Sequence, residues 1–80
     1  MKKESKYFPL SELKQSEKAK VISLEGGKGF LAHLNDMGIR VGVIVEMISN
    51  SGGPVHIKVG ESRFAIGHEM AKRIFVEKFY

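Results

Sequence analysis

The sequence predicts a mainly β domain with one helix, in which five short strands form a small, strongly bent barrel. Only one segment, residues 28–37, carries apolar residues at helical spacing over more than a single turn. Five short runs with strand-like patterns lie around it, and short connections separate the runs after residue 42. A sheet of this size leaves exposed edges unless it curls on itself, so we expect a barrel with the helix between the first two strands.

Length and composition restrict the class of protein. Eighty residues make one domain with a small core, and we expect residues 1–6 to be a disordered tail and residues 7–80 to be the folded domain. The chain has no cysteine, so it has neither disulfides nor thiolate metal sites. No apolar run approaches the ~20 residues that span a bilayer. We therefore expect a soluble, cytoplasmic protein that does not insert into the membrane.

The N-terminal half of the domain contains two elements before the helix. Residues 9–14 predict one short helical turn, with Pro9 near its start and Leu10 and Leu13 on a shared face. Residues 20–24 predict a strand that ends at two glycines. In the following helix, an inward stripe is expected from Phe30, Leu31, Leu34 and Met37.

Two glycines define the segment that follows the helix. Gly38 suits the left-handed position just past a helix end, and Ile39 and Leu34 would then make the apolar contact of a Schellman ending. Gly42 allows a tight turn into a strand over residues 43–48. We therefore expect Gly38 and Gly42 to determine the local fold.

The C-terminal half predicts the remaining strands. Residues 50–53 form a turn that ends at Gly53, and Pro54, which cannot donate a ladder hydrogen bond, belongs at the start or edge of the next strand; we expect both residues to determine the local fold. Residues 55–59 alternate strictly, and a hairpin loop at Gly60-Glu61 leads to a strand over residues 62–66. A single helical turn at residues 68–72 and a last strand at residues 74–76 complete the chain.

The charge of the chain is unevenly distributed. The formal net charge is +4, and the first 20 residues hold six lysines against three glutamates. The surplus thus lies mainly in the first quarter of the chain. This pattern favours an ordinary solvated surface over a basic nucleic-acid-binding stripe, which stays the alternative.

Few residues are candidates for chemistry. His33 and Asp36, three apart on the helix, are the candidate metal ligands, but zinc and iron sites normally need three or four. We therefore expect no tightly bound cofactor and at most weak binding of ferrous or another divalent transition metal. The glycine-rich stretch at residues 26–29 lacks the ending of a phosphate-binding P-loop. No serine or carboxylate lies in a catalytic pattern, so we do not expect an enzyme.

Six segments together resemble the FeoA family of bacterial ferrous iron transport. They are LSEL at 10–13, VISLEGG at 21–27, LNDMGIRVG at 34–42, GPV at 53–55, FAI at 64–66 and AKRIFV at 71–76. Two positions depart from the family pattern: Ser16 stands where the family often has glycine, and Met37 where leucine is usual. The family has no agreed metal-ligand motif that could be transferred.

The resemblance implies an SH3-like barrel and a non-enzymatic role beside FeoB, the membrane permease with a cytoplasmic G domain. The same barrel occurs as the C-terminal domain of DtxR-type metal-dependent repressors, so a metal-responsive regulatory domain is a further alternative. Self-association is left open. Val41 and Met70 have no obvious core role in the pattern, so we expect them to contact the partner.

Overall fold

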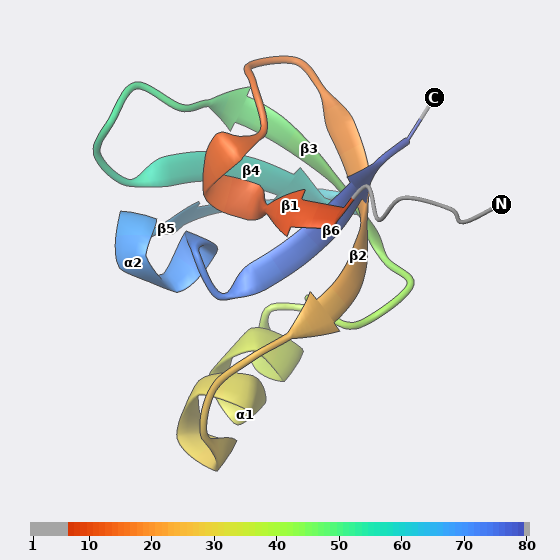
Figure 1. Ribbon diagram of the computed structural model, residues 1–80, viewed down its shortest axis with the longest axis vertical. Coiled ribbons are helices and arrows are strands. Elements are labelled where there is room, and N and C mark those ends of the chain that lie inside the picture. Colours follow the sequence, from red (N-terminus) through yellow and green to blue (C-terminus); the bar gives the residue numbers. More distant parts are fainter. Residues whose placement is uncertain (1–6, 80) are drawn as a thin grey trace, which may run out of the picture.

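The computed structural model describes residues 7–79, in which a single antiparallel sheet forms most of the fold (Figure 1). The predicted tail of residues 1–6 and the final residue, Tyr80, lie outside the described residues. The elements in chain order are β1 (Tyr7–Pro9), the 3-10 turn η1 (Leu10–Glu12), β2 (Lys18–Leu24), α1 (Lys28–Asp36), β3 (Ile44–Ser49), β4 (Val55–Val59), β5 (Ser62–Ile66), α2 (His68–Ala71) and β6 (Ile74–Lys78).

The sheet has six strands, so the prediction of five is wrong by one. Its order is β1-β6-β2-β3-β4-β5, and every pairing is antiparallel. The additional strand is β1, in which Phe8 lies opposite Val76. Three residues ending in a proline carry no periodicity, and only the pairing with β6 makes them a strand. The described pairings leave β1 and β5 as the two edges, so they show a six-stranded antiparallel sheet but do not show that it closes into the predicted barrel.

Strand β2 changes its surroundings halfway along its length. On one side it pairs with β6 from Ala19 to Leu24, with a shift in register between Val21 and Ser23 that makes Ile22 the extra residue of a β-bulge. On the other side, its pairing with β3 covers only Lys18 to Lys20. Helix α1 follows directly and lies beyond this end of the sheet (Figure 1).

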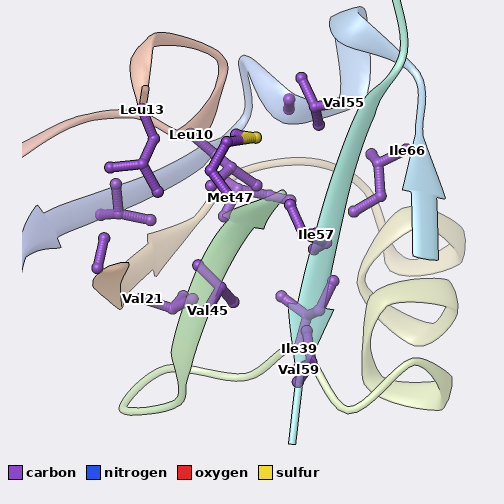
Figure 2. Close-up of a cluster of buried hydrophobic side chains, with 14 of the residues drawn as sticks. Leu10, Leu13, Val21, Ile39, Val45, Met47, Val55, Ile57, Val59 and Ile66 are labelled. Carbon is purple, nitrogen blue, oxygen red and sulfur yellow. The ribbon is translucent and has the colours of Figure 1, made fainter. Parts of the chain in front are cut away.

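The core consists of apolar side chains from almost every element (Figure 2). The predicted alternation in β4 is confirmed, because Val55, Ile57 and Val59 are all buried. Leu10 and Leu13 are also buried, as their spacing predicts. The described residues include no buried polar side chain, so burial of apolar surface is the main stabilising contribution.

The inward stripe predicted for α1 is only partly correct. Leu34 is fully buried, and Phe30 and Met37 pack against the core from its margin. Leu31 is 37% exposed, so its inward placement is wrong. Helix α1 projects beyond the sheet (Figure 1), so only a narrow part of its surface meets the core, and Leu31 is not among the residues packed there.

Helix α1 ends in a Schellman motif. Gly38 has φ +83°, and its amide donates to the carbonyl of Asn35 at 2.9 Å. The amide of Ile39 donates to the carbonyl of Leu34, also at 2.9 Å, and both side chains are completely buried. The hydrogen bonds and the apolar contact together reverse the chain towards β3.

Glycines also shape the two turns that follow. Gly42 has φ +99°, in a turn closed by a 3.1 Å hydrogen bond from the Val43 amide to the Arg40 carbonyl. In the turn before β4, the left-handed residue is Gly52, with φ +101°, and not Gly53. Pro54 lies immediately before the first residue of β4, where it interrupts no ladder.

Asn50 joins two distant parts of the chain through its side chain. Its amide nitrogen Nδ2 donates to the carbonyl oxygens of Ser11 at 2.9 Å and Leu13 at 2.8 Å. These bonds attach η1 to the end of β3, across 37 and 39 residues of sequence. They satisfy two carbonyls that no strand pairs with, and so help to hold Leu10 and Leu13 in the core.

We expect the substitution Gly38→Val to destabilise the domain by about 1–3 kcal/mol, because a β-branched residue is strained at φ +83°. A β-carbon added at Gly38 would meet only Val59 Cγ1, at 3.9 Å, so the cost comes from the backbone and not from a clash. Thermal unfolding followed by circular dichroism measures the effect. Gly38→Asn is the matched control and should cost less, since asparagine tolerates this conformation. Equal melting temperatures for the valine and asparagine variants would contradict the prediction.

Candidate docking groove

The two candidate metal ligands lie on the surface of α1. His33 and Asp36 are both exposed, and they are separated by one helical turn. Among residues 7–79, no group of three or more His, Cys, Asp or Glu side chains is placed to hold a metal ion. A single His–Asp pair provides two ligands of the three or four that a transition-metal site usually needs.

The other two histidines lie outside α1, in β4 and α2. His56 is exposed on β4. His68 Nδ1 lies 3.3 Å from the carbonyl oxygen of Gly53, to which the ring nitrogen donates its proton. That contact connects the start of α2 to the turn before β4, so the His68 side chain has a structural role.

A shallow groove of about 380 Å³ runs between α1 and the second half of β2. We call it the α1–β2 groove. It exists because β3 leaves β2 after Lys20, so that α1 and the loop behind it face Ile22 and Leu24 instead of another strand. Its lining is mostly apolar and consists of Ile22, Ser23, Leu24, Leu31, Asn35, Ile39, Arg40 and Val41.

Two apolar side chains of the groove are left open to solvent. Val41 is 63% exposed and Leu31 is 37% exposed. Among residues 7–79, four large hydrophobic side chains are exposed, and the other two are Tyr7 and Phe79. A shallow groove with exposed aliphatic residues at its rim suits contact with another polypeptide better than enclosure of a small molecule.

The two residues expected to contact a partner do not share a surface. Val41 belongs to the loop after α1, whereas Met70 lies in α2, which Figure 1 shows beside β5 and apart from α1. Met70 is partly buried and packs against the core. Sequence reasoning missed Leu31, which its helical spacing placed inward, and missed Ile22, which the bulge brings to the groove.

The position of α1, one wall of the groove, depends on a contact around Phe30. Gly26 lies so close to the Phe30 ring that a β-carbon at this position would clash with ring atom Cδ2. The guanidinium of Arg73 lies 5.7 Å from the centre of the same ring, in a cation–π arrangement. The amide of Glu25 donates to the carbonyl of Arg73 at 2.9 Å. These contacts attach the first turn of α1 to the end of β2 and to the turn before β6.

Glu17, whose pKa is the one clearly shifted among residues 7–79, lies away from the groove. Lys78 Nζ donates to Glu17 Oε2 at 2.8 Å, and the backbone amide of Lys14 donates to Glu17 Oε1 at 2.8 Å. The bond from Lys78, followed by that from Lys14, holds the pKa of Glu17 below its usual value. Ser16, just before Glu17, adopts φ +72°, a conformation that favours glycine.

Within the described residues, no helix has the length and apolar character needed to cross a membrane. The fold is that of a small SH3-like module built on an antiparallel sheet, with a helix inserted between its second and third strands. The chain belongs to the FeoA domain family, which matches residues 8–78. As a member of this family it is a transport accessory protein and not an enzyme.

Individual relatives support this assignment. The chain is 37% identical over 70 residues to an Fe(2+) transport protein A of Methanocaldococcus jannaschii. The aligned segment covers 88% of this chain and 85% of the relative. The crystal structure of an iron uptake regulatory protein, FeoA, matches with a TM-score of 0.84 and 37% identity over 91% of this chain and 97% of that one.

A repressor of another class has the same fold. A manganese-dependent transcriptional repressor matches with a TM-score of 0.86 over 96% of this chain and 44% of the repressor. The identity is 12%, so this similarity shows the fold alone.

We expect the ion pair of Glu17 to make stability depend on pH in the acid range. Because the pKa of Glu17 is lowered by folding, its contribution is present above the ordinary value of about 4.5 and is lost as the pH falls through the folded value. Melting temperatures between pH 6 and 3 measure this loss. The decrease in melting temperature between pH 6 and pH 3 should be smaller in Glu17→Gln than in the wild type. Glu12→Gln, which removes an exposed glutamate outside the ion pair, should behave like the wild type, and an unchanged slope in Glu17→Gln would contradict the prediction.

We also expect the isolated protein to bind ferrous or zinc ions weakly or not at all, because His33 and Asp36 offer only two ligands. Isothermal titration calorimetry under anaerobic conditions measures the binding. Stoichiometric, sub-micromolar binding that disappears in His33→Ala would overturn this expectation and make the helix pair a metal site.

Proposed function

We propose that this protein is a cytoplasmic accessory protein of ferrous iron transport that acts by binding the cytoplasmic part of a FeoB-like permease. Membership of the FeoA domain family, over residues 8–78, is the observation that supports the transport role most strongly. The protein of M. jannaschii is described as an Fe(2+) transport protein, and we extend that role to this chain. Iron is then the cargo of the system and not a resident cofactor of this domain.

The α1–β2 groove is our candidate for the docking surface. Val41 is the most exposed large apolar residue in the described chain, and it lies beside the partly exposed Leu31. Burying both side chains against a partner would remove apolar surface from water, and aliphatic residues within a groove make effective anchors. Arg40 and Asn35 on the same rim can supply the polar contacts that fix orientation.

A matched set of substitutions tests the role of the groove. We expect Val41→Asp to weaken binding to a purified cytoplasmic domain of the permease at least tenfold, because it places a charge within an apolar contact. Since Val41 is 63% exposed, the variant should keep the wild-type melting temperature within a few degrees. Ser51→Asp adds the same charge at an exposed turn on another part of the surface and should bind normally.

The outcomes separate the parts of this proposal. A folded Val41→Asp variant that binds with wild-type affinity and restores iron uptake in cells would show that docking occurs elsewhere. Two results together would overturn the proposal that the permease is the partner. The wild-type protein would fail to bind the permease domain, and cells that lack this protein would take up iron at the full rate. Sedimentation of the wild type and the Val41→Asp variant shows whether a second copy of the chain occupies the groove instead.

A further inference from the structure

The outer face of the sheet carries a row of charged side chains that crosses four strands. The register places Lys18 of β2 opposite Glu46 of β3, Glu46 opposite Lys58 of β4, and Lys58 opposite Arg63 of β5. We call these four residues the charged row. With neighbouring strands about 4.8 Å apart, the row is roughly 14 Å long. Its formal charge is three positive against one negative.

These side chains are not engaged with one another. The ion pairs within residues 7–79 are Lys72 with Glu69 and Lys78 with Glu17, and neither involves the charged row. Glu46 therefore neutralises neither lysine beside it by direct contact. All three cations keep their hydrogen-bond donors available for another molecule.

The pair Lys58 and Arg63 is unfavourable for the fold. Two like charges directly opposite on one face of an antiparallel pair repel each other and destabilise the sheet. Neither side chain has a carboxylate within ion-pair distance in the described chain. An anionic group placed between them would reverse this repulsion, since each cation would then face an opposite charge.

The surface is also hollowed along the row. Lys18, Glu46 and Lys58 line a shallow depression of about 230 Å³. Arg63 lines a neighbouring depression of about 360 Å³, together with His56 and Phe64. A ligand lying across the strands would therefore meet cations in two adjacent hollows, with Glu46 near the middle of its path.

We propose that the charged row binds an acidic polypeptide segment, one whose carboxylates are separated by uncharged residues. The three cations require a negatively charged ligand, and Glu46 selects among such ligands. Its carboxylate repels a continuous polyanion such as a nucleic-acid backbone or an anionic bilayer, which would place negative charge along the whole row. A peptide with spaced carboxylates can contact Lys18 on one side and the Lys58–Arg63 pair on the other without facing Glu46.

This surface is distinct from the α1–β2 groove. The charged row lies on the outward positions of β2 to β5, whereas the groove is formed by α1 and the second half of β2. The two surfaces share no lining residue. The protein could therefore hold an apolar segment in the groove and an acidic segment on the row at the same time.

A labelled octapeptide of alternating serine and glutamate is the probe for this proposal, with binding followed by fluorescence anisotropy in 50 mM salt. We expect Lys58→Gln combined with Arg63→Gln to raise the Kd at least fivefold without lowering the melting temperature, because the substitutions relieve the repulsion. Glu46→Gln should lower the Kd. Lys14→Gln combined with Lys28→Gln, which removes the same charge from exposed sites outside the row, should leave the Kd within twofold of wild type.

Several results would overturn the proposal. One is the absence of measurable peptide binding at low salt, and another is an equal loss of affinity in the Lys14/Lys28 control, which would indicate net charge alone. Tighter binding of a 20-base-pair DNA duplex or of vesicles containing phosphatidylserine, abolished by the Lys58/Arg63 pair of substitutions, would assign the row to that ligand instead. The permease takes no part in this experiment, so its failure leaves the proposed transport function untouched.

Discussion

The partial pairing of β2 is the constraint on which the rest of the structure depends. Lys20 is the last residue of β2 in its ladder with β3, although the strand continues along β6 to Leu24. The chain must therefore leave the sheet, form α1 and return within the loop that ends at Val43. Two hydrogen bonds complete the return: the Gly42 amide donates to the Val21 carbonyl at 2.7 Å, and the Val21 amide donates to the Val43 carbonyl at 2.8 Å. The groove, the exposure of Val41 and the narrow contact of α1 all follow from this geometry.

Local rules in the sequence predict most elements of the fold, because those rules depend on neighbouring residues. The alternation from Val55 to Val59 requires one face of a strand to be buried, and the spacing of Leu34, Gly38 and Ile39 defines a helix end without reference to the rest of the chain. Strand β1 obeys no such rule. Its three residues become a strand only through Val76 and its neighbours, which lie almost 70 residues away.

The candidate surfaces are less predictable, because they depend on where elements meet. Val41 could be identified as an apolar residue without a core position, but Leu31 follows the helical pattern of a buried residue and is exposed only because α1 projects past the sheet. The charged row depends on the register of four strands, which no single segment encodes. At Ser16, where the sequence comparison above expects glycine more often, the backbone adopts the left-handed φ of +72° that glycine favours.

The antiparallel pairing of β1 with β6 brings the first and last described strands together. Tyr7 lies opposite Glu77, so both ends of the folded chain leave the same corner of the sheet (Figure 1). A short linker could therefore join them, and the chain could be opened instead at the exposed Gly60-Glu61 turn between β4 and β5. Such a circular permutant would keep every strand pairing while its new ends emerge beside β4 and β5. The order of the segments along the chain is thus separable from the architecture that they build.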